Sequence, residues 1–153
     1  MARHLELRRS ITLKGAAGKV FSLFTPAGET LWVEGWVPEY LHPPHGITQK
    51  GMIFRTSHGD EVTLWACTEW DPDALHVTYA RVTPTSRFGF VDVSCRPLDD
   101  RTTEAVIVYS FTALNEAGES FLAHMTPSAY DALMDDWQSA INRYLDKQTG
   151  ADI

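Results

Sequence analysis

Apolar and polar residues alternate along much of the first three quarters of the chain, and the period changes after that. Residues 4–13 alternate loosely and predict a first strand, and the apolar positions of 16–24 predict a short helix after it. A helical turn is expected over 27–32, where a Thr-Pro pair provides a cap followed by a proline. Residues 37–46 are rich in proline and are expected to form an ordered loop.

Strand-like runs rich in Val, Thr, Tyr, Phe and Trp follow, separated by turns rich in Pro and Asp. This pattern predicts an antiparallel meander. Gly59 and Gly89 are candidates for the bends that a wrapped sheet requires. The runs cover residues 51–56, 61–70, 75–82, 87–96 and 103–114.

The C-terminal third is predicted to form a long amphipathic helix over 121–145, because its apolar residues recur every three or four positions. Thr126-Pro127 could cap and restart this helix, which leaves two collinear pieces or one kinked helix as alternatives. Asp131, Asp135 and Asn142 are expected opposite the apolar stripe. The stripe consists of Ala129, Leu133, Trp137, Ile141 and Tyr144.

This order of elements predicts an α+β fold in which the long helix covers the apolar face of a curved antiparallel sheet. We expect one domain over residues 1–148 and a frayed tail over 149–153. The 44% of hydrophobic and 22% of charged residues are typical of a globular protein.

The charge and hydropathy of the chain exclude some partners. A net charge of −7 disfavours a nucleic-acid backbone or an anionic membrane as the main partner. No apolar run approaches the ~20 residues of a membrane span, and the first residues lack the apolar segment of a secretory signal. We therefore expect a cytoplasmic protein with no membrane insertion. A small basic cluster, Arg3, Arg8, Arg9 and Lys14, is expected to be the solvated face of an edge strand.

The sequence contains no pattern typical of a metal site, a disulfide framework or a cofactor. Cys67 and Cys95 lie in apolar runs and are expected to be small buried hydrophobes. His42 and His45 would lie ~9 Å apart along an extended polyproline segment, with no third ligand apparent. KGAAGKVF at 14–21 lacks the spacing and the hydroxyl of a phosphate loop, and no nucleophile–base pair stands out, so catalytic residues are not assigned.

Five stretches of the sequence, together with the order of elements, carry a family resemblance. They are VFSLFTPAGETLWVEGWVPEYL (20–41), VTLWACTEWDP (62–72), HVTYARVTP (76–84), VIVYSFTALNEAG (106–118) and DDWQSAINRYL (135–145). They resemble the START-related lipid-transfer domains, polyketide cyclases and pollen-allergen-like proteins of the SRPBCC superfamily, and in particular a bacterial subfamily of unassigned activity. The resemblance covers nearly the whole chain.

The resemblance implies the helix-grip fold, in which an antiparallel sheet wraps around a long C-terminal helix and two short helices after the first strand close one end. It also implies a cavity between sheet and helix that takes a hydrophobic or amphipathic small molecule.

The candidate ligand-binding residues are mostly aromatic and come from three regions. The resemblance places the first group in the segment that seals the cavity mouth, where they either line the cavity or cap the core. The second group lies on strands, on faces expected to be concave, although the orientation of the strand tryptophan stays open. The third lies on the long helix, where core packing is the alternative. The mouth segment contributes Trp32, Trp36 and Tyr40. The strands contribute Trp65, Tyr79, Arg81, Tyr109 and Phe111, and the long helix contributes Tyr130, Met134 and Trp137.

Arg81 would bring a permanent charge into an apolar cavity and would need a partner there. Asp92, Glu69 and a ligand carboxylate or enolate are the candidates, and pairing to a structural acid or a place on the wet face is the alternative. Tyr79 and Tyr109 could orient a carbonyl ligand through their hydroxyls, or they could direct these hydroxyls to water.

Three functions follow from these observations, and the fold does not decide among them. The first is binding of a hydrophobic or amphipathic small molecule. The second is an enzyme of the polyketide cyclase/dehydratase kind, in which Arg81 and a tyrosine stabilise an enolate while His45 or Asp92 moves the proton. The third is a protein-interaction module, since a related branch of the fold serves as a co-chaperone. A homodimer through an edge strand or the aromatic segment also stays open.

Overall fold

Seven antiparallel strands form one sheet in the computed structural model, which describes residues 3–151. The strand order is β1-β7-β6-β5-β4-β3-β2, so every pair except β1 with β7 joins consecutive strands of the described chain. The predicted meander is therefore confirmed. The strands are β1 (His4–Leu13), β2 (Glu39–His42), β3 (Ile53–His58), β4 (Glu61–Asp71), β5 (His76–Thr83), β6 (Arg87–Asp99) and β7 (Thr102–Ala113).

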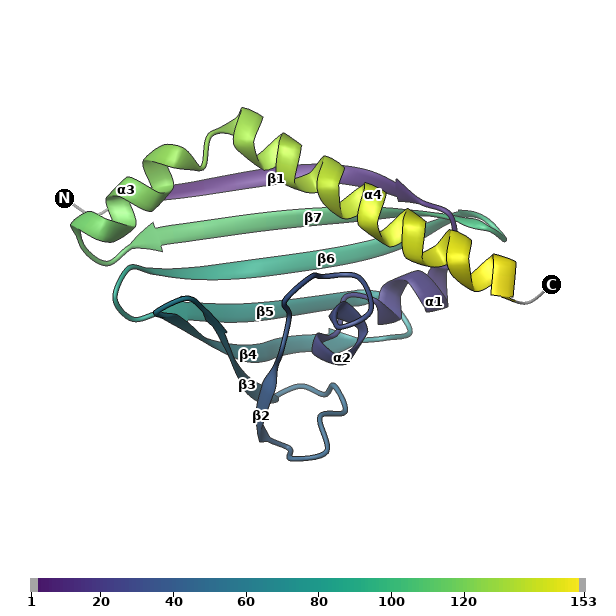
Figure 1. The fold of residues 1–153 in the computed structure, drawn as a ribbon, viewed down its shortest axis with the longest axis horizontal. Helices are drawn as coiled ribbons and strands as arrows, with labels where there is room; N and C mark the ends of the chain where they lie inside the picture. The colour runs from purple at the N-terminus through teal and green to yellow at the C-terminus, as the bar shows by residue number, and fades with distance from the viewer. Residues whose placement is uncertain (1–2, 152–153) are drawn as a thin grey trace.

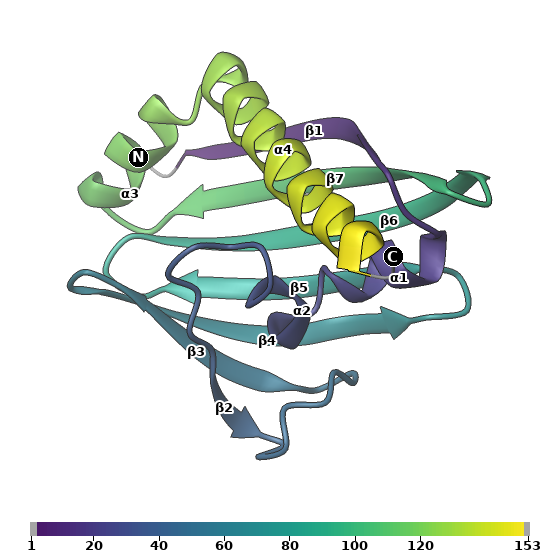
Figure 2. The ribbon, with the colours of Figure 1, turned by 45° about the vertical axis from the view of Figure 1, so that its right-hand side comes forward.

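The helices cover one face of this sheet, as Figure 1 shows. They are α1 (Ala17–Ser22), α2 (Pro26–Glu29), α3 (Glu116–His124) and α4 (Pro127–Ala151). Helix α4 crosses the concave face diagonally, and α1 and α2 fill the space beside its C-terminal half (Figure 2). The predicted α+β arrangement is confirmed. No helix in the described part of the chain is long and apolar enough to cross a bilayer.

One expectation about the elements was wrong. Residues 37–46 are not only a loop, because β2 forms there and Tyr40 pairs with Phe54 of β3. An edge strand tolerates the prolines that surround it.

The helix predicted over 121–145 is interrupted at Thr126-Pro127, one of the two alternatives, but the two pieces meet at an angle and are not collinear (Figure 1). The backbone leaves the helix at Met125, and α4 restarts at Thr126, whose hydroxyl oxygen accepts a hydrogen bond from the Ala129 N–H at 3.1 Å.

Helix α4 buries a row of side chains next to the predicted stripe. The two rows share Ile141, and the buried row repeats at spacings of four and seven, so spacing alone does not decide which of them faces the sheet. Ala129 is exposed, and Trp137 is half-buried. The helix continues to Ala151, into the segment 149–153 that was expected to fray, and the last two residues of that segment lie outside the described residues. The fully buried row is Tyr130, Met134, Ile141 and Leu145.

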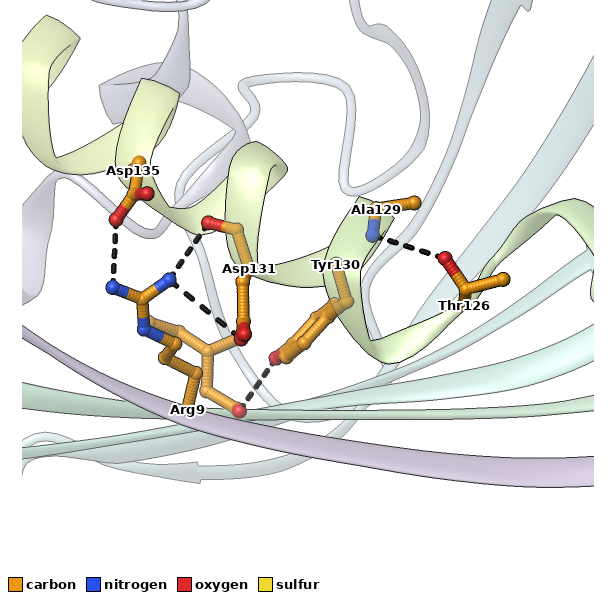
Figure 3. A network of polar contacts seen from close by, with 7 residues as sticks. Arg9, Thr126, Ala129, Tyr130, Asp131 and Asp135 are labelled. Carbon is orange, nitrogen blue, oxygen red and sulfur yellow. Dashed lines mark hydrogen bonds and ion pairs between the residues drawn. The ribbon is translucent and has the colours of Figure 1, made fainter.

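Polar contacts fix α4 to the edge strand β1 (Figure 3). The Arg9 guanidinium donates to the Asp131 carbonyl at 2.7 Å and to the Asp135 carboxylate at 2.6 Å. On the buried side of the helix, the Tyr130 hydroxyl donates to the Ile107 carbonyl of β7 at 2.7 Å. The basic face of β1 is thus not only solvated, as was expected, because Arg9 anchors the helix that covers this edge of the sheet.

Candidate functional site

A cavity of about 300 Å³ opens between the concave face of the sheet, the segment 33–37 and α4. A narrow extension of about 20 Å³ continues from it toward Phe24 and Val93 in the core. Aromatic side chains form most of the shared wall, with one carboxyl group among them. The residues that line both spaces are Glu29, Trp65, Tyr109 and Trp137.

One row of residues runs across four neighbouring strands at the centre of this wall. Trp65 of β4 pairs with Arg81 of β5, Arg81 with Gly89 of β6, and Gly89 with Phe111 of β7. The Arg81 guanidinium carbon lies 4.4 Å from the Trp65 ring centroid and 5.5 Å from that of Phe111. A Cβ atom on Gly89 would lie 2.6 Å from the Phe111 ring. The missing side chain at Gly89 therefore leaves the space in which arginine and phenylalanine approach each other.

Arg81 points into the cavity, as the strand alternation predicted, but neither of its predicted protein partners is correct. Asp92 lies on the other face of β6 and contacts His76 at 2.6 Å. A β-bulge between Cys67 and Glu69 turns Glu69 outward, where it pairs with Lys50 at 3.8 Å. Among the described residues, no carboxylate lies within 4.0 Å of the Arg81 guanidinium to form an ion pair.

The electrostatic surroundings of Arg81 come from other elements. Burial lowers the pKa of the Arg81 guanidinium, and the nearby Tyr109, Glu61 and Glu29 act in the opposite direction. The group stays charged nevertheless, because arginine is not deprotonated in proteins. Burial also raises the pKa of Tyr109 to about 12, which the neighbouring Arg81 partly offsets.

Glu29 brings a carboxyl group to the same wall from the last residue of α2. Burial raises its pKa to about 8, against the opposing effect of Arg81, so this carboxyl is mainly protonated near neutral pH. The short helix is held in place at its start, where the Thr25 hydroxyl oxygen accepts from the Gly28 N–H at 2.9 Å. Gly28 is required there, since a Cβ would lie 2.0 Å from the Ser22 carbonyl oxygen.

A second arginine beside the cavity does have a carboxylate partner. The buried Arg87 donates two hydrogen bonds to Glu61, at 2.9 and 3.2 Å, and its guanidinium carbon lies 3.5 Å from the Phe121 ring centroid. The hydrogen bonds from Arg87 lower the pKa of Glu61. The sequence reasoning missed Glu29, Glu61 and Arg87. Only Arg87 carried a signal, since alternation along β6 places it on the same face as the apolar Val91.

The aromatic candidates use their polar atoms mostly within the protein. The Tyr79 hydroxyl donates to the Phe24 carbonyl at 2.8 Å, so its proton is used within the protein. The Trp65 indole donates to the Thr56 hydroxyl at 2.9 Å. The indoles of Trp32 and Trp36 donate to the carbonyls of Leu23 and Pro26 at 2.8 and 2.9 Å. Arg81, Glu29 and Tyr109 remain as polar groups at the aromatic part of the wall, and Glu34, Ser57, His58 and Thr63 also line the cavity.

Solved structures share this arrangement over nearly the whole chain. An uncharacterised protein from Rhizobium leguminosarum has a TM-score of 0.71 at 14% identity, covering 96% of this chain and 97% of that one. Norcoclaurine synthase from Thalictrum flavum, in complex with dopamine and hydroxybenzaldehyde, has a TM-score of 0.67 at 10% identity, covering 95% and 88%. Ara h 8.0201 has a TM-score of 0.65 at 10% identity, covering 97% and 99%.

The chain has the helix-grip, SRPBCC-type fold. The predicted resemblance is confirmed at this level, and identities this low show the fold alone. In sequence, the chain matches no protein-family profile and no curated protein.

The predicted site residues fall into two groups in the helix-grip structure. Those that line the cavity or its extension are Trp36, Trp65, Tyr79, Arg81, Tyr109 and Trp137. The others support the wall or lie elsewhere. Trp32 packs against Phe24 and Trp137, with ring centroids 6.1 and 5.3 Å apart. Phe111 stacks on Tyr109, Tyr130 and Met134 are core residues of α4, and Tyr40 lies in a separate surface groove beside Gly46.

His58 lines the cavity, whereas the two cysteines and His45 do not. Cys67 and Cys95 are buried and free, as predicted, and burial raises their pKa to about 11 and about 12. His45 accepts a hydrogen bond from the Ile47 N–H in its own loop. Among the described residues, no three His, Cys, Asp or Glu side chains are placed to hold a metal ion.

Proposed function

We propose that the protein binds a small amphipathic molecule in the cavity between the concave face of the sheet and α4. The observation that carries this proposal is the wall shared by the cavity and its extension, where Trp65, Tyr109 and Trp137 surround the Glu29 carboxyl and Arg81 lies against Trp65. More polar residues, among them Glu34, Ser57 and His58, line the rest of the cavity. Mostly apolar walls with a few convergent polar groups are typical of small-molecule sites.

The size of the cavity favours a ligand of one or two rings. Its volume of about 300 Å³ is at the lower end of the range for ligand pockets. The tryptophan side chains that line it, Trp36, Trp65 and Trp137, suit a flat apolar body better than a long flexible chain. The bound dopamine and hydroxybenzaldehyde of the norcoclaurine synthase structure are single-ring molecules, which agrees with this choice by analogy.

A thermal-shift screen against fatty acids, sterols, flavonoids and small aromatic compounds tests the proposal. A ligand at about 100 times its Kd stabilises the folded state by about 2.7 kcal/mol, which raises the midpoint by roughly 5–10 °C at this chain length. We expect small aromatic compounds to give this shift and to change tryptophan fluorescence.

Two half-buried tryptophans provide a matched pair of variants. Trp36→Ala removes part of the wall and is expected to weaken binding, whereas Trp70→Ala removes a ring that stacks on Phe21 outside the cavity. The proposal fails if no compound class shifts the midpoint, or if both variants weaken binding equally.

The second candidate is an enzyme that moves a proton in the same cavity, as in the cyclase/dehydratase hypothesis. The observation that favours it is Glu29, a carboxyl with a pKa of about 8 near Arg81 and Tyr109. Such a group suits general acid–base catalysis at neutral pH. Glu29, and not Asp92 or His45, is therefore the candidate for the group that moves the proton. Asp92 lies on the opposite face of β6, and His45 lies in a loop outside the cavity. Glu29→Gln would abolish turnover and leave ligand binding in place, whereas a pure binding protein would show no turnover to lose.

A further inference from the structure

We propose that the molecule bound in this cavity is a small aromatic monocarboxylate, whose carboxylate binds Arg81 while its ring lies among the tryptophans. The inference rests on the proposed function and names the charge and shape of its ligand. Three independent features lead to it: the pairing of charges along the wall, the geometry around Arg81, and the place of Glu29 beside it.

The charges along the wall leave one positive group without a counter-charge. Arg87 and Glu61 form a bidentate pair that balances itself. Arg81 has no such partner among the described residues, and the neighbouring Glu29 carboxyl is mainly protonated near neutral pH. Apart from the exposed Glu34 at the mouth, the cavity wall therefore carries a net charge of about +1 at neutral pH, which a ligand with one negative charge would neutralise.

The geometry around Arg81 selects a carboxylate over a more compact anion. Rings of Trp65 and Phe111 lie on two sides of the guanidinium, so its N–H groups are left for Tyr109 and for a partner in the cavity. A planar guanidinium held in this way matches a planar carboxylate through two parallel hydrogen bonds. An aromatic ring attached to that carboxylate would extend toward Trp36 and Trp137, which line the same cavity.

The Glu29 carboxyl makes binding of an anion depend on pH. In its protonated form it can donate a hydrogen bond to the ligand carboxylate, and in its ionised form it repels the ligand and competes for Arg81. No neighbouring tyrosine titrates in the same range, because burial raises the pKa of both tyrosines that face it. The titratable and charged groups around Glu29 are Tyr79 and Arg81 of β5, Tyr109 of β7, Glu61 of β4, Arg87 of β6, and His58 and Glu34 at the mouth.

Three probes with the same ring system test the charge preference: 2-naphthoate, 2-naphthamide and 2-naphthylmethylammonium. Calorimetric titration at pH 7 is expected to show naphthoate binding about tenfold or more tightly than the amide, as a charge-assisted pair would give, and the ammonium compound binding most weakly. Arg81→Gln is expected to remove the preference for the carboxylate. Arg55→Gln makes the same change of charge at an exposed pair with Glu39, outside the cavity, and is expected to leave the preference intact.

Glu29→Gln gives a second test that does not depend on the folding of the Arg81 variant. If only the protonated form binds, the affinity of the wild-type protein for naphthoate falls about tenfold between pH 7 and pH 9, while that of Glu29→Gln stays constant. The tenfold figure follows from the pKa of about 8. The probe itself remains ionised over this range.

The outcomes separate the two proposals. Equal affinity for naphthoate and naphthamide, a preference that survives Arg81→Gln, or a pH dependence that survives Glu29→Gln overturns the inference and leaves cavity binding standing. Absence of binding by all three probes overturns the inference as well. If the wider compound panel also gives no shift, the proposed function fails with it.

Discussion

Removing the charge of Glu61 is expected to destabilise the fold through the arginine that it pairs with. Arg87 is one of the most buried charged side chains described here, with 6% of its side chain exposed, and its two hydrogen bonds to Glu61 neutralise it. Its Nε atom has no partner among the described residues, so the pair with Glu61 is the main compensation for burying the charge. Glu61→Gln keeps the shape of the side chain and removes the counter-charge.

The magnitude follows from the burial of the two partners. Breaking a fully buried ion pair costs about 3–5 kcal/mol, because one charge is left buried and uncompensated. Glu61 is 38% exposed, and glutamine retains one acceptor, so we reduce the expected loss to about 2–3 kcal/mol. The exposed pair of Arg55 with Glu39 is the matched control, because Glu39→Gln makes the same chemical change where the acid is 60% exposed. There we expect only a small loss, because solvent screens an exposed pair.

Thermal unfolding of the wild-type protein and the two variants measures this difference. Glu61→Gln should lower the thermal midpoint by roughly 5–10 °C, and Glu39→Gln by a few degrees at most. Since Arg87 lowers the pKa of Glu61, the contribution of the pair is present above the ordinary pKa near 4.5 and is lost as pH falls through the lower value of the folded state. Equal losses in the two variants, or a Glu61→Gln loss that does not shrink in acid, would refute the reasoning.

Three further predictions concern single contacts. Gly89→Ala would place a Cβ 2.6 Å from the Phe111 ring and should cost about 1–3 kcal/mol, measured as a lower urea midpoint with an unchanged slope. Thr126→Ala removes the cap of α4 and should cost about 1 kcal/mol, while Thr126→Ser should restore most of it. Glu29 binds its proton more tightly in the folded state, so the stability that it contributes is complete below pH 4.5 and is lost as pH rises through about 8. Denaturation at pH 6 and pH 9 should show this loss, and Glu29→Gln should remove it.

The alternation of side chains along each strand predicted the concave faces well, because it depends only on neighbouring residues of the same strand. Tyr79 and Arg81 share the cavity side of β5, and Tyr109 and Phe111 share that of β7, as the sequence indicated. The same reasoning missed the β-bulge after Cys67, which turns Glu69 to the outside. A bulge adds one residue to one strand only, and the residues of β4 alone do not show where its pairing with β5 is interrupted.

The charged part of the site was harder to predict because its members come from distant segments. Glu29 reaches the cavity from a four-residue helix, and nothing in its neighbouring residues indicates that it faces an arginine of β5. Glu61 and Arg87 meet across two hairpin ends. Arg87 alone was visible, as a charged residue among apolar ones on one face of β6.

The two arginines of the cavity wall show why side-chain pairing, and not residue type, determines what the site can bind. Both lie on the concave face, close to aromatic rings, and both would be costly to bury alone. Glu61 neutralises Arg87, so the counter-charge of this arginine comes from the protein itself. Arg81 has no carboxylate partner among the described residues. An apolar residue of similar volume would fill the space between Trp65 and Phe111 without a desolvation penalty. Contacts with Trp65, Phe111 and Tyr109 compensate part of the cost of burying the Arg81 charge, and under the proposed function an anionic ligand would supply the counter-charge.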